Sequence, residues 1–239
     1  MSRKTWLITG ATSIIAQEFA HLAAKSGCNL LLLARNPAEL AVIASNFRLR
    51  YKIQCTVVVI NFSENISPEL DELMKQNEDL SLFIAHSLTL NNEDLTPKHS
   101  NALIQTNITS TVQLIQAYFA KKQAAHELVF LSSVAGSRGR AKNSLYGASK
   151  KAIEVYLEGL QQQAKPNEHI TIARLGFIDT VQTYGLPGVF YASPPKDCAK
   201  ACWHAVMQRK RIIYHPFFWR YIMGIIKQLP FFIYKRLKV

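Results

Sequence analysis

Hydrophobic and polar positions along this 239-residue chain alternate between two kinds of segment. Short apolar runs of strand length are followed by longer segments in which apolar residues recur every three to four positions, as they do on one face of a helix. The runs expected to form strands are Trp6–Thr9, Asn29–Ala34, Thr56–Asn61, Leu80–His86, Leu128–Ser132, Ile170–Leu175 and Arg211–Tyr214. The segments expected to form helices are Ser13–Ser26, Pro37–Phe47, Pro68–Gln76, Asn101–Lys122, Tyr146–Gln163 and Pro195–Gln208.

This order of segments predicts the fold class. Apolar strands separated by amphipathic helices are typical of a parallel sheet that is covered by helices on both faces, with right-handed crossovers. We therefore expect an α/β protein with a Rossmann-type, doubly wound parallel sheet of about seven strands. A chain of this length needs only one core. Residues 1–215 are predicted to form one domain, and residues 216–239 a basic amphipathic C-terminal extension.

Polar residues and glycines stand where most of the predicted strands end. Because the carboxyl ends of parallel strands meet at one edge of the sheet, ligands of such folds bind there. We expect these residues to gather in a single cleft. They are Thr9, Gly10, Arg35, Asn61, His86, Ser87, Ser132, Ser133 and Gly176.

The charge of the chain is unevenly distributed. The formal net charge is +12, and the chain from Arg209 onward holds eight Lys or Arg residues and no Asp or Glu. Such a bias favours an anionic partner or surface. The basic residues lie among Trp, Phe, Ile and Tyr at helical spacing, without a recognisable nucleic-acid module, so an anionic lipid surface fits better than nucleic acid.

Cysteine usage and the N-terminus bear on the compartment. Four cysteines, Cys28, Cys55, Cys198 and Cys202, show neither CxxC spacing nor accompanying histidines. Buried reduced thiols are therefore expected rather than a metal site. The first residues run directly into the predicted strand at Trp6 and lack the longer apolar region of a signal peptide. We expect the protein to stay in the cytoplasm.

The first predicted turn, residues 9–16, reads TGATSIIA between a strand and a helix. The unpaired N–H groups at the start of that helix can bind a dinucleotide pyrophosphate. The turn resembles the TGxxxGxG pattern of the short-chain dehydrogenase/reductase superfamily, with Ile14 and Ala16 in place of the later glycines. The resemblance implies cofactor contacts from Gly10, Thr12, Ser13, Ile14 and Ile15, with the Ile14 N–H donating while its side chain turns away.

A second motif strengthens this resemblance. Ser133 ends a strand thirteen residues before Tyr146, and Tyr146 and Lys150 stand four apart at the start of a helix. A cation near a phenol stabilises its phenolate and lowers its pKa from about 10. The family pattern implies that Tyr146 donates the proton in carbonyl reduction, Ser133 bonds the substrate oxygen and Lys150 bonds the nicotinamide ribose. Asn107 matches a fourth catalytic residue, which bends its helix and holds a water molecule beside Lys150.

The cofactor's identity depends on the end of the second predicted strand. The segment there contains Arg35 and no acidic residue, so a 2′-phosphate is favoured over a free ribose hydroxyl. NADP(H) is therefore expected. NAD(H) is the alternative if Arg35 is only a solvated helix-start residue. The resemblance also implies cofactor-lining roles for Asn61, Phe62, Ala85, His86, Ser87, Gly176, Phe177, Ile178 and Thr180.

Over nearly its whole length the chain resembles a narrower bacterial group, similar to the reductase that completes 2′-epimerisation of decaprenylphosphoryl ribose. Residues 10–16, 132–140 and 216–223 carry this likeness. It implies a lipid-linked ketosugar substrate in cell-envelope glycan synthesis, a separate flavin oxidase as partner, and a homodimer or homotetramer. A soluble carbonyl or 3-oxoacyl reductase and a non-catalytic cofactor-binding sensor are the alternatives.

The C-terminal extension has two interpretations. Apolar residues recur at helical spacing through Trp219, Met223 and Ile226, with basic residues beside them. Arg220, Lys227 and Pro230 interrupt the stretch too often for it to span a bilayer. It is either a helix packed on the domain or between subunits, or an interfacial helix on the inner face of the cytoplasmic membrane.

Overall fold

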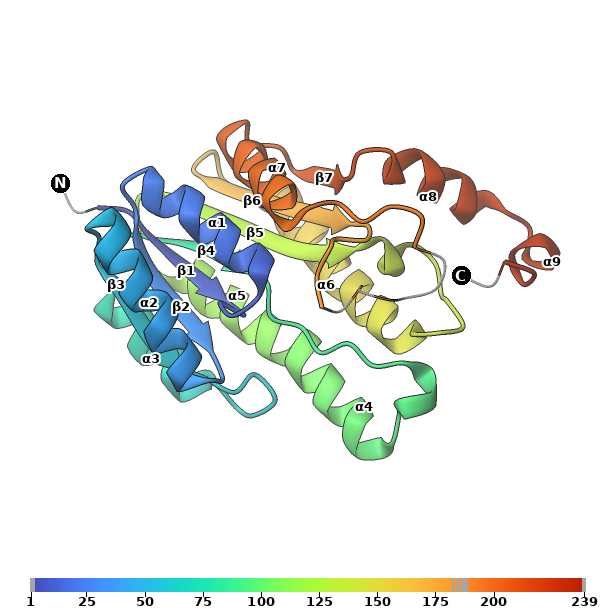
Figure 1. Ribbon diagram of the computed structural model, residues 1–239, viewed down its shortest axis with the longest axis horizontal. Helices are drawn as coiled ribbons and strands as arrows, with labels where there is room; N and C mark the ends of the chain where they lie inside the picture. Colours follow the sequence, from blue (N-terminus) through green and yellow to red (C-terminus); the bar gives the residue numbers. More distant parts are fainter. Residues whose placement is uncertain (1–2, 182, 184, 186–188, 238–239) are drawn as a thin grey trace.

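The computed structural model describes residues 3–181, 183, 185 and 189–237. Its centre is a seven-stranded sheet in the order β3-β2-β1-β4-β5-β6-β7, and every neighbouring pair is parallel (Figure 1). The predicted doubly wound parallel sheet is confirmed. The strands are β1 Thr5–Thr9, β2 Asn29–Ala34, β3 Cys55–Val59, β4 Leu80–Ile84, β5 His126–Ser133, β6 Glu168–Leu175 and β7 Ile212–His215.

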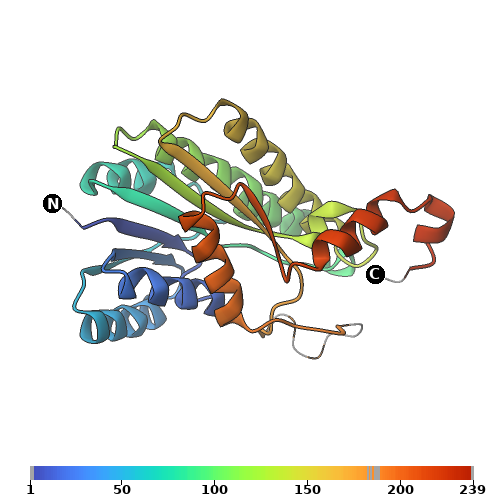
Figure 2. The same ribbon diagram turned by 90° about the horizontal axis from the view of Figure 1, so that it is seen from above.

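Helices cover both faces of the sheet, as Figure 2 shows from above. Helices α1, α2 and α7 pack on one face and α3, α5 and α6 on the other, each set around its own buried apolar cluster. The helices of the domain are α1 Ile14–Lys25, α2 Pro37–Tyr51, α3 Ser67–Gln76, α4 Pro97–Ile104, α5 Ser110–Ala120, α6 Ser144–Gln163 and α7 Pro195–Met207.

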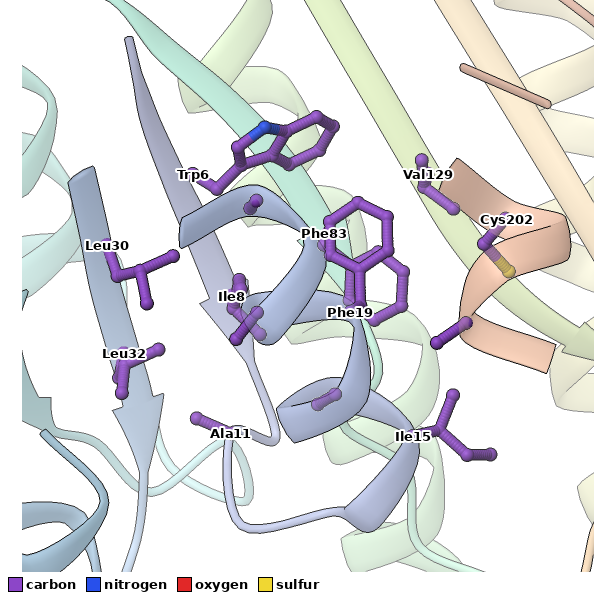
Figure 3. Close-up of a cluster of buried hydrophobic side chains, with 14 of the residues drawn as sticks. Trp6, Ile8, Ala11, Ile15, Phe19, Leu30, Leu32, Phe83, Val129 and Cys202 are labelled. Carbon is purple, nitrogen blue, oxygen red and sulfur yellow. The ribbon is translucent and has the colours of Figure 1, made fainter. Parts of the chain in front are cut away.

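The core on the α1 face is built on aromatic side chains. Phe19 of α1 stacks on Phe83 of β4 with ring centroids 4.0 Å apart, and Trp6 of β1 meets Phe19 edge-on at 4.9 Å (Figure 3). Burying one such side chain contributes about 1.5–3 kcal/mol. Cys202 of α7 borders the same cluster as a free thiol. This packing fixes β1 and β4, whose ends open onto the cleft.

The segment Asn101–Lys122, predicted as one helix, is helical as far as Ala120 but is interrupted at Asn107, where the family resemblance implied a bend. The segment forms α4, then a π-helical turn, η2, over Gln105–Thr109, and then α5. A π-helical turn accommodates one extra residue in a helix and shifts the faces that follow. No proline or glycine marks this interruption in the sequence, so the local pattern reads as one continuous helix.

The C-terminal extension is two helices rather than one. Helix α8 spans Trp219–Gln228 and α9 spans Phe231–Tyr234, at one end of the molecule (Figure 1). The break falls at Leu229, which is extended with ψ 130°, because a residue before a proline is disfavoured in the helical region. Residues 238–239, and with them the basic Lys238, lie outside the described residues. Among the residues described, no helix is long and apolar enough to cross a membrane.

Candidate active site

A cleft of about 780 Å³ lies along the carboxyl ends of the strands. The residues predicted at the strand ends gather here, as the alternating pattern implied, except Thr9, which is buried behind the cleft against His86. Strands β3 and β4 end two residues earlier than expected, so Asn61 and His86 stand in the loops that line the cleft. Apart from Asn107, every predicted site residue lines it: Gly10, Thr12, Ser13, Ile14, Ile15, Arg35, Asn61, Phe62, Ala85, His86, Ser87, Ser133, Tyr146, Lys150, Gly176, Phe177, Ile178 and Thr180.

The loop between β1 and α1 depends on one glycine. Gly10 has φ +62°, and a Cβ atom at this position would lie 2.8 Å from the His86 backbone nitrogen. Glycine adopts this conformation without strain and permits that approach. Ile14, where the family pattern has a glycine, has a side chain that is 45% exposed, so its bulk does not have to fit inside the core. The first turn of α1 therefore keeps its amides beside the cleft.

His86 forms a neutral wall of the cleft. Its Nδ1 lies 2.8 Å from Thr9 Oγ1 and its Nε2 lies 3.0 Å from Thr111 Oγ1. The imidazole stacks on Phe62 with ring centroids 3.8 Å apart. Burial, together with the nearby Lys150 charge, lowers the pKa of His86 to about 3. A histidine held in this way lines a ligand and does not serve as a base near neutral pH.

Arg35 and Asn61 line the cleft where β2 and β3 end, and they differ in whether their side chains have partners within the protein. Asn36 caps α2 by accepting from the Ala38 and Glu39 amides at 3.1 and 3.3 Å, so the helix start needs nothing from Arg35. Within the described part of the chain, Arg35 is exposed and has neither a hydrogen bond nor an ion pair. The Asn61 amide instead bonds Ser63 and Glu64 of its own loop. Arg35 is thus the side chain left available for a ligand.

Tyr146 lies at the start of α6, beside the end of β5. The Ser133 and Thr89 hydroxyls lie close enough to its phenol to stabilise its anion, and so does the Arg140 guanidinium. Burial raises the pKa of Tyr146, while the two hydroxyls and Arg140 act to lower it. The Ala135 amide donates to Ser133 Oγ at 3.1 Å. The phenol therefore stays protonated at neutral pH and is surrounded by groups that stabilise its anion.

Lys150 lies one turn further along α6 and is 5% exposed. Its ammonium donates to the Leu131 carbonyl at 2.9 Å and lies 5.8 Å from the centroid of the Tyr146 ring. Burial lowers the pKa of Lys150 to about 8, although the Glu154 carboxylate acts to raise it. This cation is thus held near the phenol in a medium where its charge is felt strongly.

Asn107 does not reach the cleft. It is buried in the π-helical turn, and its side-chain amide donates to the Leu88 carbonyl at 2.8 Å and to Ser149 Oγ at 3.0 Å. Its Oδ1 accepts from the Leu88 amide at 2.7 Å. The side chain therefore ties the loop after β4 to α6, on which Tyr146 and Lys150 stand. The water-holding role implied by the sequence stays a prediction.

Comparison with known proteins places this geometry in a family. Residues 4–184 match the family model described as short chain dehydrogenase, well over half of the chain. The chain belongs to the short-chain dehydrogenase family. An uncharacterized oxidoreductase of Staphylococcus aureus is 26% identical over 223 residues, covering 89% of this chain and 94% of the relative. One from Staphylococcus epidermidis is 26% identical over 192 residues, covering 77% and 82%.

Solved structures agree on the fold of this short-chain dehydrogenase. A short-chain dehydrogenase from Sphingobium yanoikuyae in complex with NADPH has a TM-score of 0.81 at 18% identity, covering 95% of this chain and 96% of that one. A short chain dehydrogenase from Shigella flexneri complexed with NADP has a TM-score of 0.80 at 22% identity, covering 90% and 97%. The protein is therefore an oxidoreductase of this family.

Several polar residues of the cleft were missed by the sequence interpretation, among them Thr89, Arg140 and Asn143. Thr89 follows β4 by five residues and reaches the Tyr146 phenol. Arg140 and Asn143 stand in the connection between β5 and α6. No short motif marks them, because loops that follow the catalytic strand take their positions from tertiary contacts. The only signal for Arg140 and Asn143 is their place in the sequence between Ser133 and Tyr146, and Thr89 has none.

Proposed function

We propose that this short-chain dehydrogenase is an NADP(H)-dependent reductase that converts a carbonyl into an alcohol. The observation that carries the proposal is the half-buried Tyr146 phenol beside the Ser133 hydroxyl and the Lys150 ammonium, at the edge of the sheet where cofactors of this fold bind. When bound, NADPH supplies the hydride for such a reduction.

Side chains of the protein would bind the substrate oxygen, protonate it and stabilise the phenolate that forms. Ser133 Oγ already accepts from the Ala135 amide, so its own O–H is free to donate to the substrate oxygen. Tyr146 gives its proton to the same oxygen as negative charge develops there. The phenolate that remains is stabilised by the charges of Lys150 and Arg140. Tyr146 thus keeps its proton before the reaction, and the site stabilises its phenolate afterwards.

The open first turn of α1 and the unpaired Arg35 fit a dinucleotide with a 2′-phosphate. Gly10 keeps the loop close to His86, and the neutral imidazole presents no charge to the cofactor. Solved relatives complexed with NADPH and NADP support the same cofactor here. Lys150 would bond the nicotinamide ribose, and the segment from Gly176 to Ile178 would lie beside the nicotinamide.

Replacing Arg35 with alanine is expected to weaken NADPH binding roughly 10- to 100-fold and to change NADH binding little. Only NADPH carries the 2′-phosphate, and a charge-assisted pair contributes about 1.5–3 kcal/mol. Fluorescence titration of both cofactors measures the effect. Lys25→Ala, which removes an exposed cation at the far end of α1, is the control. An equal loss for both cofactors would show that Arg35 has no cofactor role.

NADPH affinity is expected to fall as the pH rises through about 8, where the Lys150 ammonium of the free protein loses its proton. The neutral amine is a weaker donor to the ribose and no longer attracts the anionic cofactor. His86, with a pKa of about 3, stays neutral across this range, and Tyr146 keeps its proton because its pKa is raised. Titrations of the parent and of Lys150→Met measure the dependence. A parent curve as flat as that of Lys150→Met would contradict the role of Lys150.

The substrate class that we propose is a lipid-linked ketosugar at an anionic membrane surface, and the C-terminal helices support it. Phe217, Tyr221 and Ile225 follow one another at intervals of four and are 73%, 66% and 65% exposed. Trp219 and Met223 turn to the opposite side and pack against Val134 of the domain. Helix α8 thus has one face that anchors it and one apolar face toward solvent.

The surroundings of this exposed face match an anionic bilayer. Phe231 and Phe232 of α9 are 72% and 62% exposed and add apolar surface nearby. Arg220, Lys227, Lys235 and Arg236 are exposed, and the chain has no Asp or Glu after Asp197. Apolar side chains at the acyl boundary with cations at the headgroups are the combination that holds an interfacial helix.

The same proposal includes the partners that the sequence implied. A separate flavin oxidase would supply the ketosugar by oxidising a sugar hydroxyl, and this protein would return it to the alcohol. Assembly into a homodimer or homotetramer belongs to the proposal as well. A soluble carbonyl or 3-oxoacyl reductase remains the second candidate, and a protein of that kind would not need the exposed face of α8.

The protein is expected to co-sediment with vesicles containing anionic lipid at low salt, to be released by added salt, and to leave neutral vesicles unbound. Salt screens the attraction between exposed cations and headgroups. The triple variant F217S/Y221S/I225S should lose binding. V42S/L49S/M207S is the matched control, since these three apolar side chains are equally exposed elsewhere. Equal sedimentation of both triple variants, or an absence of anionic vesicle binding by the parent, would contradict the membrane proposal.

A further inference from the structure

Arg140 presents a cation to the cleft without an internal partner. It lines the cleft together with Tyr146 and Asn143, and its Nε is buried with no hydrogen-bond partner. Among the described residues, no carboxylate lies within 4.0 Å of its guanidinium. Asn143 Oδ1 is likewise buried and unpartnered. Two unsatisfied polar groups therefore stand at the same end of the cleft.

An unpaired cation withdrawn from water costs free energy. Burial accordingly lowers the pKa of Arg140. The ionisable groups that face it are the phenols of Tyr146 and Tyr234, and the raised pKa of Tyr146 keeps that phenol uncharged at neutral pH. The described part of the chain therefore places no carboxylate in contact with Arg140, although it holds this residue near Tyr146. A ligand that brings an anion would remove the cost.

The loop that carries Arg140 is held in place by the C-terminal helices. Arg138 donates to the Leu229 carbonyl at 2.8 Å, and its guanidinium lies 3.8 Å from the centroid of the Tyr234 ring. The Tyr234 hydroxyl in turn donates to the Gly139 carbonyl. The two residues before Arg140 are thus fixed to the segment that follows α8, so the position of Arg140 is built into the fold.

The residues proposed to bind the cofactor's phosphates lie away from Arg140. Arg35, the proposed partner of the cofactor's 2′-phosphate, follows β2, whereas Arg140 follows β5. Strands β1 and β4 lie between these two in the sheet. The amides proposed for the pyrophosphate belong to the start of α1, directly after β1. Arg140 is instead on the side of Ser133 and Tyr146, where the substrate oxygen is bound.

We propose that Arg140 and Asn143 form a subsite for an anionic oxygen group on the carbonyl substrate, either a phosphate ester or a carboxylate. The planar guanidinium can bind two oxygens of such a group, and the Asn143 amide is free to bond a neighbouring hydroxyl. Binding there would place the reacting carbonyl against Tyr146. This inference rests on the proposed reductase function and adds to it the residues that would recognise an anionic group of the substrate.

A binding experiment tests the subsite without turnover. The protein saturated with NADP⁺, so that the cofactor's phosphate contacts are filled, is titrated with inorganic phosphate and separately with acetate. The nuclear magnetic resonance signal of the Arg140 Nε–H, identified by its loss in Arg140→Lys, is expected to shift saturably with at least one anion. The anion that binds more tightly distinguishes a phosphate ester from a carboxylate. No shift with either anion would overturn the proposal.

A kinetic experiment tests specificity. If phosphate is the anion bound, kcat/KM for dihydroxyacetone phosphate is expected to exceed that for dihydroxyacetone by roughly 10- to 100-fold. Arg140→Gln should lose that preference, and Lys142→Gln, an exposed cation two residues away, should keep it. For a carboxylate, pyruvate and acetone form the equivalent pair. A preference unchanged in Arg140→Gln would contradict the subsite, whereas failure to reduce any carbonyl would count against the reductase proposal, leaving the resonance shift to decide the subsite.

Discussion

Replacing Tyr146 with phenylalanine is expected to lower carbonyl reduction by about 10²–10⁴-fold while NADPH binding changes by no more than a few-fold. The substitution removes the hydroxyl that carries the transferable proton and leaves the ring in place. Ser133 would still bond the substrate oxygen, but no acid would remain to protonate it. The Lys150 ammonium already donates to the Leu131 carbonyl and lies 5.8 Å from the centroid of the Tyr146 ring, so it does not replace the lost acid.

The measurement is the rate of NADPH oxidation with a reducible carbonyl, together with a fluorescence titration of NADPH. Tyr156→Phe is the matched control, because Tyr156 stands on the same helix and its hydroxyl bonds with Gln116, outside the cleft. This control should retain the parent rate. Turnover by Tyr146→Phe above a tenth of the parent rate would remove Tyr146 from the role of proton donor.

Replacing Glu154 with leucine is expected to destabilise the fold by about 3–5 kcal/mol, as is usual when one partner of a buried ion pair is removed. The Glu154 carboxylate is 3% exposed and lies 2.9 Å from the Arg174 guanidinium. It also accepts from Ser132 Oγ at 2.6 Å, next to Ser133, for which we propose a bond to the substrate oxygen. Burial acts to lower the pKa of Arg174, but bonding with Glu154 holds this pKa above its ordinary value.

Thermal unfolding measures this effect. A loss of this size corresponds to a Tm lower by roughly 6–20 °C for a domain of this length. Glu158→Gln is the control, since Glu158 contacts the same guanidinium but is 39% exposed, and exposed pairs contribute only about 0–1 kcal/mol. The double variant Glu154→Leu/Arg174→Met should recover most of the loss, because no buried charge is left unpaired. A Tm unchanged in Glu154→Leu would contradict this account of the β5–α6–β6 junction.

The fold was largely predictable because local patterns and tertiary packing agree. Strand β2 begins and ends where the apolar run does, since Asn29 and Arg35 bound five consecutive buried positions. The interruption of the helix before α5 was not predictable in this way. The buried Asn107 amide is held by Leu88 and Ser149, which are distant in sequence, and those bonds accompany an extra residue in the turn.

The candidate site was likewise predictable where local spacing determines it and unpredictable where distant contacts do. Ser133, Tyr146 and Lys150 could be found because the chemistry requires fixed spacings on one strand end and one helix. Arg140 could not be found, because its position depends on Arg138 and Tyr234 meeting across more than ninety residues of chain. Nor could the sequence show that α8 would turn Tyr221 and Ile225 to solvent, because that choice depends on where Trp219 packs.

The measurement that tests the central claim most directly follows the hydride. The protein is incubated with NADPH deuterated at the nicotinamide carbon that donates hydride and with a panel of neutral, phosphorylated and carboxylated ketones, and the products are examined by mass spectrometry. We expect deuterium on the carbinol carbon of at least one product, with about 10²–10⁴-fold slower formation by Tyr146→Phe. NADPH binding without deuterium in any product would contradict it and would favour a non-catalytic cofactor-binding role.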